Sequence, residues 1–163
     1  MAKVLVVYYS LTGNTKFIAE HISKELNADI EEVKPIKDLD PDSGTKYLWG
    51  GMKATMKSKP KLEDLKYNPL EYDFIILGTP VWAWTLSPSI RSYCSKFDFD
   101  DKKVALFTSS AGDGKKAMGR FKDFMEKSNI IGEIRFTDPL TTNPEQAKTQ
   151  ATEWANGLKS KIQ

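Results

Sequence analysis

Dense apolar runs alternate with amphipathic stretches along this chain. The densest runs lie at residues 4–9, 74–77 and 104–107, and each is short, rich in β-branched or aromatic residues, and followed by small polar or turn-forming residues. Runs of this kind predict β-strands that are buried on both faces of a sheet. Weaker runs at residues 30–33 and 134–137 predict two more strands. We therefore expect five strands.

Helical patterns separate and follow these strands. They cover residues 14–26, about 88–97, 114–127, and a last stretch that opens with Asn143-Pro144-Glu145 and runs to about residue 162. Strands that alternate with helices predict a parallel sheet with helices on both faces, a doubly wound α/β fold. Residues 37–69 fit this alternation least well, and we interpret them as a long, partly helical connection.

Composition and charge narrow the class of protein. The chain has 163 residues, of which 40% are hydrophobic, which suits one domain over residues 1–163 with a full core. It carries 24 Lys and Arg against 22 Asp and Glu, a formal net charge of +2, and its basic residues are scattered. A scattered, nearly balanced charge argues against a nucleic-acid partner.

Single copies of cysteine and histidine limit the chemistry. Cys94 has no partner for a disulfide or a cysteine metal site, so we expect a buried thiol in a reducing cytoplasm. His21 follows Phe17 by one helical step and is most simply a residue on a helix surface. We expect no metal, no membrane insertion and no secretion signal, because the chain lacks a Cys/His cluster and an apolar run of about 18 residues.

The six residues Ser10-Leu11-Thr12-Gly13-Asn14-Thr15 stand between the first strand and the first helix. The start of a helix offers unpaired N–H groups and the positive end of the helix dipole, which together suit a phosphate. Hydroxyl and amide side chains add donors, and glycine lets the backbone close around the anion. The alternative is that the run only caps the helix, which needs one such residue rather than four. The spacing matches neither a Walker A loop nor a dinucleotide fingerprint.

This hexapeptide after a first strand resembles the phosphate loop of the flavodoxin family. The resemblance covers the whole chain, through its length, its five-strand pattern and two further loops after the third and fourth strands. It implies a bound FMN and the strand order 2-1-3-4-5. The implied cofactor contacts are Ser10, Leu11, Thr12, Gly13, Asn14 and Thr15 in the first loop, Thr79, Pro80, Val81, Trp82, Ala83 and Trp84 in the second, and Ser109, Ser110, Ala111, Gly112 and Asp113 in the third.

Alternatives stay open for several of these residues. Trp82 and Trp84 are placed to line a flat ring, or else to anchor the core or to be exposed by chance. Asp113 is a cofactor contact or the N-cap of the following helix. The third loop lacks the tyrosine that carrier flavodoxins place on the ring, so Trp82, Trp84 or the aromatic cluster of Tyr47 and Trp49 are candidates to cover its outer face.

The resemblance implies an FMN-binding redox protein in which no side chain needs to act as an acid or base. We weigh an NAD(P)H-dependent reductase of quinones or other small acceptors against a low-potential electron carrier that docks on redox partner proteins. The net charge of +2 argues against a carrier of the acidic kind, although Asp98, Asp100 and Asp101 could still steer a partner. A non-redox anion-binding or signalling module of the same fold is the alternative from another class.

Overall fold

Five parallel strands form the sheet of the computed structural model, which describes residues 1–55 and 57–163, apart from the side chains of Lys46 and Tyr47. The strands are β1 (Val4–Tyr8), β2 (Asp29–Glu32), β3 (Phe74–Trp82), β5 (Lys103–Ser110) and β6 (Asn129–Thr137). They lie in the order β2-β1-β3-β5-β6, which confirms the predicted order 2-1-3-4-5. A two-residue strand, β4 (Thr85–Leu86), pairs antiparallel with the end of β3 and was not predicted.

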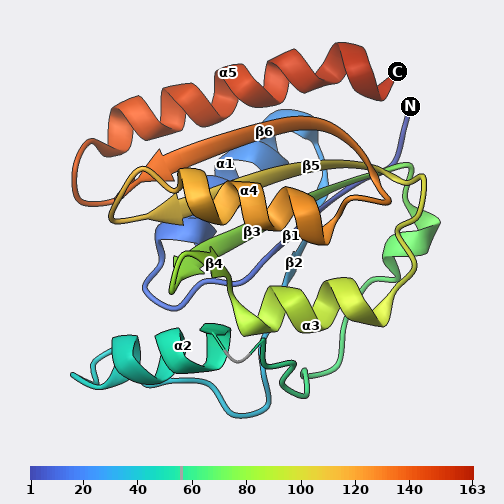
Figure 1. Cartoon of the computed structure of the whole chain (residues 1–163). Coiled ribbons are helices and arrows are strands. Elements are labelled where there is room, and N and C mark those ends of the chain that lie inside the picture. The colour runs from blue at the N-terminus through green and yellow to red at the C-terminus, as the bar shows by residue number, and fades with distance from the viewer. Residues whose placement is uncertain (56) are drawn as a thin grey trace.

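Helices cover both faces of the sheet, as the alternating pattern predicts (Figure 1). On one face lie α1 (Asn14–Leu26) and α5 (Pro144–Ile162), and on the other lie α3 (Pro88–Lys96) and α4 (Lys115–Phe124). The parallel strands point to the left in Figure 1, away from both termini. Their carboxyl ends therefore meet at one edge, where a doubly wound sheet binds its ligands.

The core divides into one apolar cluster on each face. In β1, Leu5 and Val7 pack toward α3 and α4, while Val4 and Val6 pack toward α1 and α5. All five residues of β1 are buried, so the continuous apolar run correctly predicts a strand covered on both faces. Cys94 is buried on α3, also as predicted.

The connection between β2 and β3 is partly helical, as predicted. It contains α2 (Lys46–Thr55) and a short 3₁₀ helix, η1 (Pro69–Glu71). In Figure 1, α2 lies at the lower left, on the side to which the strands point. The connection is fastened there by the Tyr9 hydroxyl, which donates a 2.7 Å hydrogen bond to Asp38 Oδ1. It therefore borders the end of the sheet at which the predicted site residues stand.

Candidate functional site

A cavity of about 230 Å³ lies at the carboxyl ends of β1, β3 and β5. Its walls come from the three loops that the sequence singles out. The predicted residues that line it are Ser10, Leu11, Thr12, Asn14 and Thr15 from the first loop, Pro80, Val81 and Trp82 from the second, and Ser109, Ser110 and Ala111 from the third. The fold thus brings together eleven of the seventeen predicted site residues in one hollow.

The first loop enters α1 through Gly13, which has φ 99° and makes no side-chain cap hydrogen bond. This left-handed backbone favours glycine over any residue with a Cβ. The first helical bond runs from Phe17 N to Gly13 O at 3.0 Å. The N–H groups of Asn14, Thr15 and Lys16 have no acceptor among the described residues. The opening turn is therefore uncapped by side chains, unlike the capping alternative, and presents free donors.

Hydroxyl groups in the same loop keep a proton to donate. Ser10 Oγ accepts a 3.1 Å bond from Gly13 N, and Thr12 Oγ1 accepts a 3.4 Å bond from Asn14 Nδ2. A hydroxyl that accepts in one bond can still donate its own hydrogen in another. Two hydroxyl donors therefore join the free amides around this end of the cavity.

Asn14 ties the first loop to the loop after β6. Its Oδ1 accepts a 3.1 Å hydrogen bond from Leu140 N, while its Nδ2 is engaged with Thr12. The sequence predicts that the Asn14 amide donates to an anion. In the structure, the same amide also positions the loop after β6. Its side chain holds two loops at a fixed spacing.

A buried hydroxyl pair joins the first and third loops. Thr15 Oγ1 and Ser109 Oγ lie 2.7 Å apart, and the two side chains are 1% and 3% exposed. Buried polar atoms are costly when they lose their partner, so this bond fixes the two loops relative to each other. It links the phosphate-loop candidate to the far wall of the cavity.

The two tryptophans of the second loop have different surroundings. Trp82 lines the cavity and packs edge-on against Tyr9, with ring centroids 5.4 Å apart and an interplanar angle of 89°. Gly50 of α2 sits so close to Trp82 that an added Cβ would lie 3.1 Å from its ring. Trp84 is 67% exposed, does not line the cavity, and has Lys116 Nζ 5.6 Å from its ring centroid. The structure therefore separates two residues that the sequence treats alike.

The third loop divides between the cavity and the start of α4. Asp113 Oδ1 accepts a 2.9 Å hydrogen bond from Lys115 N, and Gly114, with φ 68°, is the cap residue itself. Asp113 therefore caps the first turn of α4 from the position before the N-cap. The N-cap itself is Gly114 and not Asp113, as the alternative had it. Neither Asp113 nor Gly112 lines the cavity.

Three further predicted residues support the walls without lining them: Gly13, Thr79 and Ala83. Thr79 is fully buried, and its hydroxyl accepts a 2.9 Å bond from Ser87 N while it lies 3.1 Å from Ser87 Oγ. These bonds hold the start of α3 against the end of β3. Ala83 has φ 48° and belongs to the turn between β3 and β4.

Sequence reasoning missed the loop after β6. Asp138 lines the cavity, has φ 37°, and donates from its N–H to Ser110 O at 2.8 Å. The Asp-Pro pair directly after the fifth predicted strand was the available signal, because it marks a turn at the same edge of the sheet.

Tyr9, counted only as a strand residue, also supports the site, since it packs against Trp82. Burial, and then the hydrogen bond to Asp38, raise the pKa of the Tyr9 hydroxyl well above its usual value. Tyr9 therefore stays neutral and serves as a rigid support for the tryptophan.

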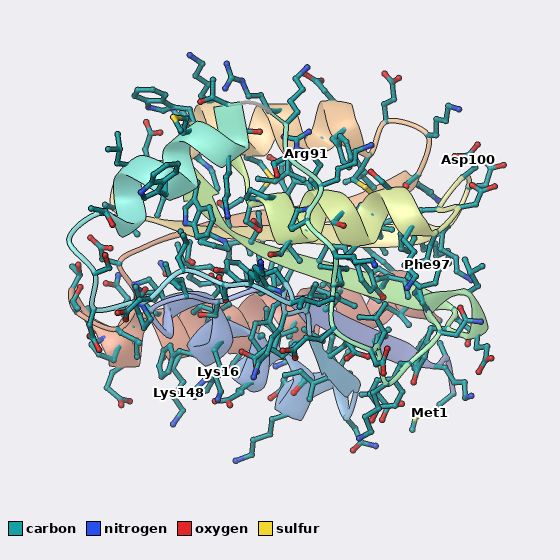
Figure 2. The ribbon with its side chains drawn as sticks, turned by 90° about the horizontal axis from the view of Figure 1, so that it is seen from below. Met1, Lys16, Arg91, Phe97, Asp100 and Lys148 are labelled. Carbon is teal, nitrogen blue, oxygen red and sulfur yellow. The ribbon has the colours of Figure 1, made fainter. Side chains whose placement is uncertain are left out.

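The cavity lining does not include Lys16, Trp49 or the acidic residues 98, 100 and 101. Lys16 is exposed, and Asp98, Asp100 and Asp101 precede β5 at the amino ends of the strands. In Figure 2, Lys16 and Asp100 lie toward opposite ends of the molecule. Trp49 is 49% exposed on α2, and the side chain of Tyr47 lies outside the described residues. The acidic residues are therefore remote from the cavity.

His21 lies partly buried on α1, where its Nδ1 is 2.8 Å from Phe17 O and its ring centroid is 4.6 Å from that of Phe17. Within residues 1–55 and 57–163, no cluster of three or more His, Cys, Asp or Glu side chains is arranged to hold a metal ion. None of the helices in this part of the chain combines the length and apolar character needed to cross a membrane.

Comparison with known proteins assigns the class. The flavodoxin family model matches residues 3–158, and the chain therefore belongs to the flavodoxin family. Among its relatives is a flavodoxin of Maridesulfovibrio salexigens, 24% identical over 99% of this chain and 100% of that protein.

Two solved structures illustrate the likeness. A flavoprotein of Lactobacillus acidophilus, crystallised in complex with FMN, has a TM-score of 0.71 and 27% identity, over 95% of this chain and 99% of that one. Oxidised flavodoxin 2 of Bacillus cereus has a TM-score of 0.63 and 23% identity, over 98% and 99%, and shares the fold.

Proposed function

We propose that this chain binds FMN in the cavity at the carboxyl ends of the strands and moves electrons through it. The observation that carries the proposal is the first turn of α1, which has no side-chain cap and which joins Ser10 and Thr12 in lining a cavity with an aromatic wall. An anion and a flat ring are the two parts of FMN that such a site would hold. Flavin supplies one- and two-electron redox chemistry when it is bound.

The phosphate would be held by residues 10–15. Main-chain N–H groups of Asn14, Thr15 and Lys16 would donate to it, and the hydroxyls of Ser10 and Thr12 would add two further donors. A dianion held in this way needs no buried lysine or arginine. The exposed side chain of Lys16 is therefore free to remain in solvent.

The ring would lie between the second and third loops. Pro80, Val81 and Trp82 supply one wall, and Ser109, Ser110 and Ala111 supply the other. The apolar wall would keep water from the ring, and the small residues would let backbone groups approach its polar edge, where such groups would favour or disfavour charge. Trp82 is the candidate to cover the ring, because it lines the cavity, whereas Trp84 is mostly exposed and does not line it.

The finer proposal is that the protein reduces quinones or other small acceptors with NAD(P)H. Its support is electrostatic: the chain has a net charge of +2, and its acidic residues 98, 100 and 101 stand at the amino ends of the strands, away from the cavity. These three carboxylates therefore provide no acidic docking face around the flavin, of the kind that steers a carrier to a basic partner, although Asp138 lines the cavity. Electron carriage between redox partner proteins is the competing proposal, and the relatives named flavodoxin favour it. Membership of the flavodoxin family argues against the non-redox module.

Two spectroscopic steps test these proposals. Purified protein, or apoprotein mixed with FMN, is expected to show a bound-flavin absorption spectrum and to quench FMN fluorescence with one site per chain. Anaerobic NADPH or NADH is then expected to bleach that spectrum, and a quinone to restore it. A colourless protein that leaves FMN fluorescence unchanged would refute FMN binding. A flavoprotein that the nicotinamides do not bleach would instead be assigned as a carrier.

The buried, unpaired thiol of Cys94 supports a cytoplasmic setting for this activity. Burial raises the pKa of the Cys94 thiol far above its usual value, so the thiol stays protonated and unreactive. The residue therefore has a packing role rather than a part in the redox chemistry.

A further inference from the structure

A second cavity, of about 490 Å³, lies between α2, α3 and α4. Its charged lining residues are Lys57, Arg91, Arg120 and Asp123, three cations and one anion. Thr85 of β4 also lines it, and Thr85 pairs in register with Trp82, which lines the first cavity. The two cavities therefore share one hairpin as a wall.

Arg91 is the unusual member of this lining. It is 5% exposed, and in Figure 2 it lies at the end of α3 nearer to α2, while Phe97 marks the other end. Its Nη2 donates a 3.1 Å hydrogen bond to Thr85 Oγ1, and its guanidinium carbon lies 5.0 Å from the ring centroid of Phe124. A planar guanidinium held between a hydroxyl and an aromatic face is fixed in place.

The guanidinium of Arg91 has no ion-pair partner among the residues that the structure describes. The Nε of Arg91 has no hydrogen-bond partner there either. Of the buried unpartnered side-chain atoms in the described part of the chain, Arg91 Nε is the one that belongs to a charged group. Burial lowers the pKa of Arg91, although arginine keeps its proton in proteins. A buried charge without an opposite charge is strongly unfavourable, which calls for an anion beside it.

Arg120 brings a second guanidinium to the cavity from α4. Its Nη1 lies 3.3 Å from Trp84 O and 3.5 Å from Ala83 O, so its remaining N–H groups are available to another acceptor. Lys57 adds a third positive charge from the segment after α2, against the single carboxylate of Asp123. The lining therefore carries an excess of positive charge beside a buried arginine.

We propose that this cavity binds the oxyanion of a small molecule, a phosphate or a carboxylate, with Arg91 as its buried counter-ion. Arg91 and Arg120 offer the planar paired donors that recognise such groups, and Lys57 closes the site as a point charge. The bound anion sits against the hairpin that carries Trp82, so it couples α3 and α4 to a wall of the first cavity. The proposal does not depend on FMN, because none of these four charged residues lines the first cavity.

Calorimetric titration of the FMN-saturated protein tests the site, since FMN blocks the other anion site. The probes are inorganic phosphate, succinate and NADP⁺, which separate a phosphate group, a carboxylate and a phosphorylated dinucleotide. At least one probe is expected to bind the parent. Arg91→Met is expected to weaken that binding at least tenfold, because it removes the charge while keeping an apolar side chain of similar length. Asp123→Asn is expected to tighten it, because the competing carboxylate is lost.

Lys96→Met is the matched control, since it removes an exposed charge from the same helix outside the cavity. It is expected to bind the probe as the parent does. Arg120 and Lys57 are exposed, so their replacement is tolerated more easily. If Arg91→Met fails to fold, Arg120→Gln and Lys57→Met test the site instead, and each is expected to weaken binding of the probe at least threefold. The proposal is overturned if none of the three probes binds the parent, or if the tested cavity variants bind as tightly as Lys96→Met. A protein that fails to bind FMN is recognised beforehand by its spectrum, and Gly13→Val then replaces FMN as the block on the first loop.

Discussion

The loop after β1 and the hairpin of β3 and β4 stand side by side in the site but are built in different ways. The first loop is organised by its own hydroxyls, amide and glycine, and five of its six predicted residues line the cavity. The hairpin owes its shape to a turn at Ala83 and Trp84, with φ 48° and 58°, and half of its six predicted residues line the cavity. Local hydrogen bonding sets the first region, and an unusual turn sets the second.

The difference shows what a residue's type can and cannot reveal. Ser, Thr, Gly and Asn bond to nearby backbone, so their sequence order largely determines the loop that they form. A tryptophan has no such local preference, and its contacts depend on where the backbone aims it. Trp82 and Trp84 are two positions apart, yet Trp82 packs against Tyr9 and close to Gly50 while Trp84 is 67% exposed.

The largest expected effect is in the first loop, with Gly13→Val. A β-branched residue at φ 99° is strained and would reshape the turn that presents the free amides. We expect the dissociation constant for FMN, measured by fluorescence quenching, to rise about 100-fold, which corresponds to about 2.7 kcal/mol. Gly44→Ala is the control, since Gly44 has an ordinary φ and no atom within 4 Å of an added Cβ. Equal affinity of the two variants would contradict the role of the turn.

The next effect sharpens the contrast within the hairpin. Trp82→Ala is expected to raise the FMN dissociation constant about 30-fold, because an aromatic wall and its contact area are lost. Trp84→Ala is its matched control and is expected to change the constant by less than about twofold, as an exposed side chain outside the cavity. The same titration measures both. If Trp84→Ala proved the more damaging, the assignment of Trp82 as the ring's neighbour would be wrong.

A smaller effect is expected where the first loop meets the third. Thr15→Val and Ser109→Ala each leave one buried hydroxyl without its partner, at a cost of about 1–2 kcal/mol in the free energy of unfolding. The double variant should lose less than the sum of the two, with a coupling of about 1 kcal/mol in urea denaturation. Strict additivity would show that the 2.7 Å contact contributes no mutual stabilisation.

The smallest effect concerns Asp113, which the sequence leaves between two roles. Asp113→Ala removes the acceptor for Lys115 N and is expected to lower the free energy of unfolding by about 0.5–1 kcal/mol. FMN affinity should stay within about twofold of the parent, because Asp113 does not line the cavity. A loss of affinity without a loss of stability would reverse the assignment and make Asp113 a cofactor contact.

Much of the fold follows from patterns that act locally. The predicted helix over residues 14–26 matches α1 to the residue, and the apolar runs of β1, β3 and β5 correctly predict buried strands. Strands β3 and β6 extend beyond their apolar runs, because backbone pairing continues through Pro80 to Trp82 and begins at Asn129. Pairing depends on the neighbouring strand, which a local pattern does not contain.

Local sequence patterns did not predict the β3–β4 hairpin or the part that the loop after β6 plays in the site. A tight hairpin with two positive φ values normally signals itself by Asn-Gly or Asp-Gly, whereas here the turn residues are Ala83 and Trp84. Strand β4 has two residues, too few for an alternating pattern. Asp138, in the loop after β6, joins the cavity through a backbone hydrogen bond to Ser110 at the end of β5, a contact between residues that are distant in sequence. Each miss reflects a tertiary contact.

The difference in affinity between FMN and riboflavin tests the central claim most directly, because the two ligands differ only by the phosphate. If the first turn of α1 and the hydroxyls of Ser10 and Thr12 hold that phosphate, apoprotein should bind FMN at least about 100-fold more tightly than riboflavin. Dissociation constants within about twofold of each other would show that residues 10–15 hold no phosphate.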